Sequence, residues 1–308
     1  MAEQVASILA QTRPPFELVV SDDASSDNTL SIIEKLVATG SAKAPKLKIL
    51  RNSGTLGVVR NFEQAVAACT GDLIALCDQD DRWAPNRLET MAALFEADAG
   101  LLLLSSNARL IDDDDRPIGY SLFDAIAFTG AEKAAIHSGK GFTSLLARNT
   151  VTGATTVFRR SLLERAIPFP DAWVHDEWLA IIAAASGRID FLEDELVDYR
   201  QHSGNAIGAV KLGLGARFRK LREPRVERNR RLKERASILA ERLRILDVPN
   251  SLELMAESKL RHETVRSALP AGHLGRVGPI LREGARGGYR RFGRGVQDAV
   301  RDLLQPDR

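Results

Sequence analysis

DLIALCDQDDRW, at Asp72–Trp83, is the most informative segment of this 308-residue sequence. The apolar run Leu73–Cys77 has the length and composition of a buried strand, and it leads directly into Asp78, Asp80 and Asp81. Because alternate side chains of an extended chain point the same way, we expect Asp78 and Asp80 to share a face. Two carboxylates on one face suit a hard divalent cation that bridges to a phosphate. Taken alone, such a pair is also typical of an acidic turn that caps the next helix.

Strand patterns alternate with helix patterns around this segment. The predicted strands are Phe16–Ser21, Leu47–Leu50, Leu73–Cys77 and Leu101–Leu104, and the predicted helices are Asn28–Ala38, Val58–Cys69 and Pro85–Ala97. This alternation is typical of βαβ units, so we predict an α/β fold with a Rossmann-like, mostly parallel, doubly wound sheet. Ligands of such sheets bind at the carboxyl ends of strands, where acidic residues follow two of these runs.

The second half of the sequence is less regular and then changes character. Residues 107–208 contain a helix pattern at His175–Ser186 and a strand pattern at Leu196–Tyr199, and we assign residues 1–208 to one domain. Residues 209–308 are helix-favouring and hold 24 Lys and Arg against 12 Asp and Glu, whereas residues 1–208 hold 19 against 29. We predict a basic helical extension that lies on an anionic membrane surface, packs on the acidic domain or mediates self-association. No nucleic-acid recognition motif accompanies the charge.

The composition is that of a soluble globular protein. No apolar run approaches the roughly 18 residues that span a bilayer, and no basic segment followed by an apolar core opens the sequence. Cys69 and Cys77 lie among apolar neighbours without the spacing of a zinc site or of a disulfide framework. We therefore expect a cytoplasmic protein, with its position at the inner face of the cell membrane as the alternative.

Five segments in order resemble the family 2 inverting glycosyltransferases of the GT-A fold, especially bacterial rhamnosyltransferase-like members. The resemblance covers roughly residues 2–208. The segments are VVSDDASSDNT, RNSGTLGVVRNF, GDLIALCDQDDRWAPNRLE, HDEW and YRQHSGNAIG. The resemblance implies transfer of a sugar from a UDP-, dTDP- or GDP-linked donor to a glycan or lipid-linked acceptor, with Mg²⁺ or Mn²⁺ as cofactor.

The resemblance also implies roles for residues on the donor side of the site. Asp22 matches the position that receives the nucleotide base, and its carboxylate can accept a hydrogen bond from a uracil or thymine imide. Asp78 and Asp80 match the DxD motif, in which the second residue is the surer metal ligand. Arg60 either reaches the nucleotide and its phosphates or is a solvated helix charge. Arg200 can neutralise phosphate charge.

Two further positions carry implied roles and open alternatives. Asp176, in the first turn of the predicted helix, matches the catalytic base, and the helix dipole favours its ionised form. Glu177 is the next candidate, and simple capping of the helix is the other interpretation. His202 matches a histidine that contacts the metal or the diphosphate in some family members, or it is structural. Gly153 resembles the acceptor-side loop, or it permits close backbone packing.

One departure from the family pattern concerns the beginning of the chain. Family members begin with a central strand, whereas this sequence opens on what looks like the helix after it. Absence of that central strand would leave backbone groups of neighbouring strands unpaired and remove part of the pocket for the nucleotide base. A truncated, non-catalytic nucleotide-binding or scaffold protein is therefore an alternative function. A nucleotidyltransferase is another, although no Gly- and Lys-rich phosphate loop follows the first predicted strand.

Overall fold

The computed structural model describes residues 1–40, 44–201 and 224–307. These residues form two compact units, the first comprising 1–141 and 150–201, the second 142–149 and 224–307. The short segment 142–149 thus belongs to the same unit as the basic C-terminal region. The predicted boundary between residues 208 and 209 lies outside the described residues.

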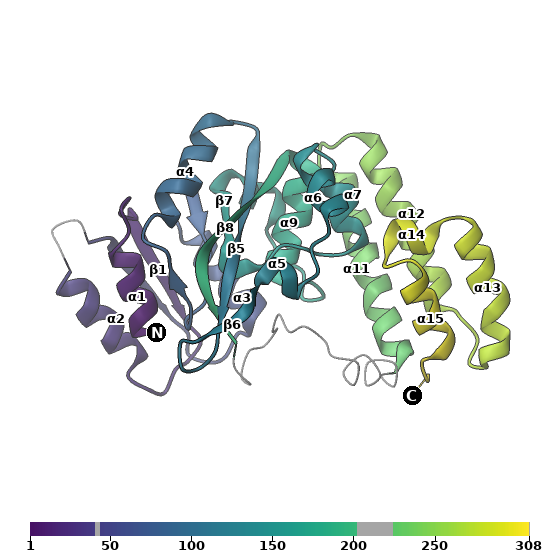
Figure 1. Cartoon of the computed structure of the whole chain (residues 1–308), viewed down its shortest axis with the longest axis horizontal. Coiled ribbons are helices and arrows are strands. Elements are labelled where there is room, and N and C mark those ends of the chain that lie inside the picture. Colours follow the sequence, from purple (N-terminus) through teal and green to yellow (C-terminus); the bar gives the residue numbers. More distant parts are fainter. Residues whose placement is uncertain (41–43, 202–223, 308) are drawn as a thin grey trace. The chain divides into compact units, whose positions relative to one another are not determined.

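The first unit is an α/β structure whose strands form two sheets (Figure 1). β1 and β2 form a parallel pair, and the six-stranded sheet has the order β3-β7-β5-β8-β4, with β6 paired to β5. The long strands β5 and β8 run side by side through the larger sheet. The strands are β1 (Glu17–Asp22), β2 (Lys46–Arg51), β3 (Leu73–Ala75), β4 (Arg82–Trp83), β5 (Leu101–Ile111), β6 (Pro117–Ser121), β7 (Thr156–Arg159) and β8 (Arg188–Arg200).

The larger sheet is mixed, which corrects the prediction of a mostly parallel sheet. Only β5 and β8 are parallel there, while β7 pairs antiparallel with both β3 and β5, and β4 pairs antiparallel with β8. The regular alternation of patterns that predicted parallel strands is confined to the first hundred residues. β6 and β7 come from the less regular part of the sequence, where the alternation that predicts parallel strands is lost. β8 follows a helix and is the strand that runs parallel to β5.

The predicted helices of the first unit are found close to their expected bounds. α9 (His175–Ser186) matches its prediction fully and is buried almost all round, with Trp178, Leu179 and Ile182 inaccessible to solvent. A helix of this kind belongs inside the molecule, and α9 packs against β5 and β8. The other helices are α1 (Ala2–Leu9), α2 (Thr29–Ala38), α3 (Val58–Ala67), α4 (Arg87–Ala97), α5 (Leu122–Ala125), α6 (Gly130–His137) and α8 (Leu163–Ala166), with 3₁₀ turns η1 (Gly153–Thr155) and η2 (Arg160–Leu162).

The two sheets are separate at the position where the sequence predicted a missing strand. The described chain opens on α1, and β1 and β3 belong to different sheets, with no described strand joining them. Gln4 of helix α1 is buried, and its Nε2 donates a hydrogen bond to the sulfur of Cys77 at 2.6 Å. Each of β1 and β3 thus has only one neighbouring strand among the described residues.

The second unit is helical (Figure 1). Its interior combines an apolar cluster of Leu269, Ile280 and Tyr289 with a network of buried ion pairs, described below. In the described parts of the chain, no helix is both long and apolar enough to cross a membrane. The helices are α7 (Gly141–Ala147), α11 (Arg225–Ile245), α12 (Asn250–Ser267), α13 (His273–Ala285), α14 (Gly288–Phe292) and α15 (Val296–Leu304).

Candidate active site

Three aspartates of the segment after β3 form the centre of the candidate site. β3 ends at Ala75, two residues earlier than predicted, and Gln79 and Asp80 lie in a turn. Strand alternation therefore does not set the directions of Asp78 and Asp80, contrary to our expectation. The turn instead places Asp78, Asp80 and Asp81 close enough to influence one another electrostatically.

The pKa values of two of these carboxyl groups are raised. Burial, followed by the negative charges of Asp80 and Asp176, raises the pKa of Asp78 to about 6. Asp81 is 1% exposed, and burial together with Asp78 and Asp80 raises its pKa to about 8. We call Asp78, Asp80, Asp81 and Asp176 the carboxylate cluster. Its members repel one another, so a cation among them would be favoured.

Arg87, at the start of α4, is a buried positive charge beside this cluster, and sequence reasoning did not single it out as part of the site. The side chain is inaccessible to solvent, and its guanidinium lies over the Trp83 ring at 4.0 Å. It donates from Nη2 to the backbone carbonyl of Ala154 at 3.0 Å. Burial lowers its pKa to about 10, and the charges of Asp81 and Asp78 oppose that shift. The sequence contains no signal for this placement, because an arginine at the start of a helix is ordinary.

Asp176, the predicted base, lies at the start of α9 and is held from two sides. Its Oδ2 accepts a hydrogen bond from the backbone N–H of Gly153 at 2.8 Å, and its Oδ1 accepts one from the N–H of Glu177 at 2.7 Å. A Cβ added at Gly153 would lie 3.3 Å from the Cβ of Asp176 and 3.1 Å from Nε2 of His175. The glycine therefore allows the η1 turn to approach the helix closely.

His175 packs between α3 and the η1 turn. Its ring stacks on Phe62 of α3, with centroids 3.8 Å apart and planes at 7°. Burial lowers the pKa of His175 to about 4, so the imidazole is neutral at physiological pH. Neither ring nitrogen has a hydrogen-bond partner among the described residues.

Arg200, at the end of β8, anchors the acidic turn. Its Nε donates to the carbonyl of Asp80 at 3.0 Å, its Nη2 lies 2.7 Å from Oδ1 of Asp115, and its backbone N–H donates to Oδ1 of Asp81 at 3.0 Å. The neighbouring Tyr199 is nearly buried, and burial with the charge of the whole carboxylate cluster raises its pKa. Sequence reasoning assigned Tyr199 no role, because a tyrosine at a strand end is common in a core.

Asp22 and Arg60 lie on other elements of the first unit. Asp22 ends β1, and its Oδ2 accepts a hydrogen bond from the N–H of Ser25 at 3.2 Å. Arg60 of α3 forms ion pairs with Glu63 at 2.9 Å and, in the loop before α9, with Asp171 at 3.0 Å. Arg60 therefore ties α3 to that loop, and Glu63 does the same by accepting a hydrogen bond from the N–H of Phe169.

The donor set around Asp78 and Asp80 suits Mg²⁺ or Mn²⁺. All of its members are carboxylate oxygens, and Oδ2 of Asp81 is a buried atom without a hydrogen-bond partner among the described residues. In the described part of the chain, no group of three or more His, Cys, Asp or Glu side chains is arranged to hold a metal ion. His202, the other predicted ligand, lies outside the described residues.

Known proteins similar in sequence include glycosyltransferases. An uncharacterized glycosyltransferase of Nostoc sp. is 27% identical over 67% of this chain and 62% of its own length. A UDP-Glc:alpha-D-GlcNAc-diphosphoundecaprenol beta-1,3-glucosyltransferase of Escherichia coli is 27% identical over 59% of this chain and 64% of its own length. The chain covers less than two thirds of either relative.

Solved structures with the same fold belong to GT-A glycosyltransferases. Staphylococcus aureus TarS 1–349 in complex with UDP-GlcNAc has a TM-score of 0.56 and 17% identity, over 97% of this chain and 87% of that one. The mannosyltransferase PcManGT from Pyrobaculum calidifontis, in complex with GDP-Man and Mn²⁺, has a TM-score of 0.54 and 21% identity, over 92% and 70%. The α/β GT-A-like fold predicted from the sequence is thereby confirmed. A model of glycosyl transferase family 2 matches residues 1–166, more than half of the chain, and the chain therefore belongs to that family.

Proposed function

We propose that this chain is an inverting glycosyltransferase that moves a sugar from a nucleotide-diphosphate donor to a hydroxyl group of an acceptor. The observation that carries the proposal is the proximity of Asp176 to Asp78. The charge of Asp176 contributes to the raised pKa of Asp78, so the predicted base and the predicted diphosphate site lie within one electrostatic environment. Family membership supports the reaction class.

The donor side of the proposed site consists of carboxylates and two arginines. Asp22 would accept a hydrogen bond from the base, Arg60 and Arg200 would offset phosphate charge, and Asp78 would face the diphosphate. Asp80, with His202, would hold Mg²⁺ or Mn²⁺. When bound, the ion would offset the negative charge that develops on the leaving diphosphate. The Mn²⁺ named with PcManGT supports this assignment.

The proposed chemistry is a single displacement at the anomeric carbon. The acceptor oxygen forms a bond to that carbon while the bond from carbon to the diphosphate oxygen breaks, so the configuration inverts. Asp176 takes the acceptor hydroxyl proton, and the nucleoside diphosphate leaves with the bonding electron pair. The N–H groups of Gly153 and Glu177 orient the Asp176 carboxylate for that transfer.

We propose a growing cell-surface polysaccharide or a lipid-linked oligosaccharide as the acceptor. The Escherichia coli relative is named for a diphosphoundecaprenol-linked sugar, which supports the lipid-linked choice. The donor is a UDP-, dTDP- or GDP-linked hexose or deoxyhexose, with rhamnose as the family-level suggestion. Such a reaction would take place in the cytoplasm or at the inner face of the cell membrane.

Calorimetric titration with UDP, dTDP and GDP, each with and without Mn²⁺, tests the donor site. We expect one nucleotide to bind in a metal-dependent manner, and Asp80→Ala to abolish that binding. Asp113→Ala is the matched control, because it removes an exposed carboxylate of the β5–β6 turn. Metal-independent binding, or equal loss in both variants, would contradict the assignment of Asp80.

Turnover measurements test the base. Asp176→Asn should lower turnover by about a hundredfold or more while nucleotide binding is retained, because general base catalysis typically contributes that much. Glu177→Gln, at the adjacent position, should leave turnover within a few fold of wild type. A larger loss of turnover in Glu177→Gln than in Asp176→Asn would assign the base to Glu177.

A non-catalytic nucleotide-binding or scaffold protein is the alternative, and one observation favours it. β1 and β3 lie in separate sheets, so the edge beside the base-binding residue Asp22 has no described strand to complete it. Metal-dependent nucleotide binding without turnover on any sugar nucleotide, with water or lipid-linked acceptors, would support this alternative.

A further inference from the structure

Helix α13 of the second unit has an inner face that packs and an outer face that does not. Ile280 points inward and forms an apolar cluster with Leu269 and Tyr289. The outward aliphatic side chains lie three and seven residues apart, so they form one stripe along the helix. They are Leu274, Val277 and Leu281, which are 91%, 39% and 67% exposed.

In residues 271–307, positively and negatively charged side chains differ in exposure. All exposed charged side chains of residues 271–307 are arginines: Arg282, Arg286, Arg290, Arg291 and Arg294. The acidic residues of this region are all partnered, and none of them is exposed. Glu283 contacts His262 at 2.7 Å, Asp302 accepts from Arg266 at 2.6 Å, Asp307 pairs with Arg225 at 2.6 Å, and Asp298 accepts from the N–H of Arg294 at 2.8 Å.

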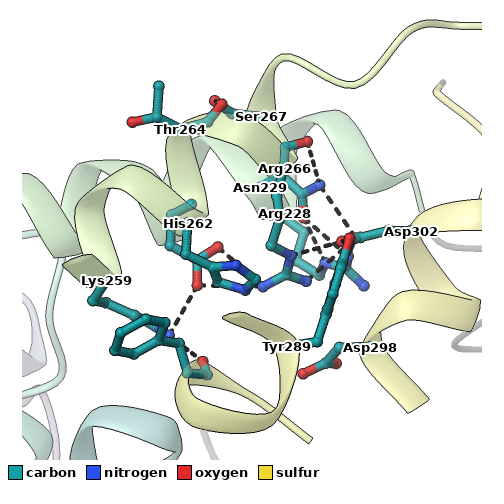
Figure 2. Close-up of polar contacts among 12 residues, drawn as sticks. Arg228, Asn229, Lys259, His262, Thr264, Arg266, Ser267, Tyr289, Asp298 and Asp302 are labelled. Atoms are coloured by element: carbon teal, nitrogen blue, oxygen red, sulfur yellow. Dashed lines mark hydrogen bonds and ion pairs between the residues drawn. The ribbon is translucent and has the colours of Figure 1, made fainter. Parts of the chain in front are cut away.

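Figure 2 shows this inward arrangement around Asp302, where Arg228, Arg266 and Tyr289 converge on one carboxylate. Because the interior holds the negative charge, the surface of α13 and α14 keeps only positive charge. We define the α13 face as the aliphatic stripe of three residues together with Arg282 and Arg286.

We propose that the α13 face docks on the surface of an anionic phospholipid bilayer. The helix would lie parallel to the surface, with the aliphatic stripe among the acyl-chain ends and the arginines at the headgroup phosphates. This inference concerns the second unit and does not depend on the glycosyl-transfer proposal.

The chemistry of the face favours a bilayer over other occupants. Two copies of this chain meeting through the same face would bring like charges together, which opposes self-association. A nucleic acid would pair with the arginines but offers no apolar surface for Leu274 and Leu281. An anionic bilayer satisfies both the charge and the aliphatic stripe.

Vesicle flotation of the full chain tests the proposal. We expect binding to vesicles of phosphatidylcholine with about one third phosphatidylglycerol, and little binding to phosphatidylcholine alone. Leu274→Asn with Leu281→Asn should lower the partition coefficient on the anionic vesicles by about tenfold or more. Arg282→Glu with Arg286→Glu should lower it by a similar factor, most clearly at low salt.

The control substitutes two exposed aliphatic side chains away from α13. Ile245→Asn with Leu254→Asn changes residues that are 78% and 54% exposed on α11 and α12 and should leave partitioning unchanged. Equal circular dichroism spectra and equal melting temperatures would establish that all variants fold. In a separate measurement, the emission of a Leu274→Trp variant should shift to shorter wavelength on anionic vesicles, whereas that of Ile245→Trp should not.

Several results would overturn the proposal. They are absence of binding to the anionic vesicles, unchanged partitioning of the Leu274→Asn with Leu281→Asn variant, and an equal loss in the control. A dimer in sedimentation equilibrium that this variant dissociates would assign the face to a second copy instead. Nucleotide titration of the same variants reports on the first unit, so failure of docking and failure of the donor site remain distinguishable.

Discussion

Gly153 is the residue at which the smallest chemical change should affect catalysis most. The methyl group of Gly153→Ala would meet Nε2 of His175 at 3.1 Å and Oδ2 of Asp176 at 3.4 Å. A shift of the proposed base Asp176 by a fraction of an ångström follows. Because misplacement by about 1 Å can cost about a hundredfold in rate, we expect a loss below that limit. We therefore expect steady-state kinetics to show a reduced kcat with nearly unchanged KM for the donor.

The matched control for this substitution is Gly130→Ala at the start of α6. A Cβ at Gly130 has no other atom within 4 Å, so turnover should match wild type. If Gly153→Ala retained full kcat, the close approach of η1 to α9 would not govern the position of Asp176.

His175 links stability to pH. Its pKa is about 4 in the folded protein and about 6.5 in the unfolded chain, so only the unfolded chain gains a proton between these values. The free energy of unfolding therefore falls as the pH falls from about 6.5 to 4, by roughly 3 kcal/mol in total. His175→Phe should retain the stack on Phe62 and remove this part of the pH dependence.

Urea unfolding at a series of pH values measures the effect. His273→Phe changes an exposed histidine at the start of α13 and should reproduce the wild-type profile. Parallel profiles for wild type and His175→Phe would show that the buried imidazole makes no contribution to acid sensitivity.

Sequence reasoning selected the carboxylates of the candidate site and missed the residues that surround them. Asp78, Asp80 and Asp176 are brought together as expected, because each follows or begins a strongly patterned element. Arg87 and Tyr199 belong to the same environment, yet an arginine on a helix and a tyrosine at a strand end are ordinary surface and core residues in a sequence. Only tertiary structure shows that both are buried beside the cluster.

Among the elements, the β1–β2 pair should be the part of the first unit that is least protected from hydrogen exchange. Two strands form its whole sheet, whereas β5 is buried in the six-stranded sheet and paired on both sides. Small sheets are marginally stable, and local opening is easiest where few strands share hydrogen bonds. Hydrogen exchange read by mass spectrometry should show faster exchange in peptides covering 17–22 and 46–51 than in peptides covering 101–111.

Similar protection of the three peptides would contradict this expectation and would mean that packing of α2 and α3 compensates for the short sheet. The same measurement with a bound nucleotide and Mn²⁺ reports whether Asp22, at the end of β1, takes part in binding. Slower exchange of 17–22 on binding is the expected direction.

The elements that the sequence predicted well are those with strong periodicity. α2, α4 and α9 lie within two residues of their expected bounds, because apolar spacing and flanking breakers define them. β5 and β8 extend far beyond the predicted runs, since their polar residues, such as Ser105 and Asn107, are buried by tertiary contacts. Strand direction was not predictable either, because pairing partners distant in sequence determine it.

At the scale of the whole molecule, stability of the second unit should depend on one carboxylate. Asp302 is inaccessible to solvent and interacts with Arg228, Arg266 and Tyr289. Asp302→Asn removes the counter-charge of the half-buried Arg228 and one of the two carboxylates that pair with the buried Arg266, which also pairs with Glu263. Breaking a buried pair typically costs about 3–5 kcal/mol. Denaturant unfolding followed by circular dichroism should show a lower midpoint for this variant.

Glu227→Gln is the control for this comparison, since it breaks an ion pair with Arg230 on the exposed surface of α11. Exposed pairs contribute little, so the midpoint should stay close to wild type. A small effect of Asp302→Asn, no larger than that of the control, would show that the network tolerates loss of its central charge.

The grouping of residues 142–149 with the C-terminal helices has a consequence for how this protein can evolve. The chain enters the second unit at 142, returns to the first at 150, and, among the described residues, contributes the rest of the second unit from 224 onward. Phe142, Leu145 and Leu146 are buried there, and Thr143 contacts Met255. A single genetic crossover that exchanged the C-terminal region for an unrelated one would leave these apolar residues without the helices of their own unit. Replacement of the helical unit would therefore also require substitutions in the internal segment 142–149. We expect the two units to be inherited together.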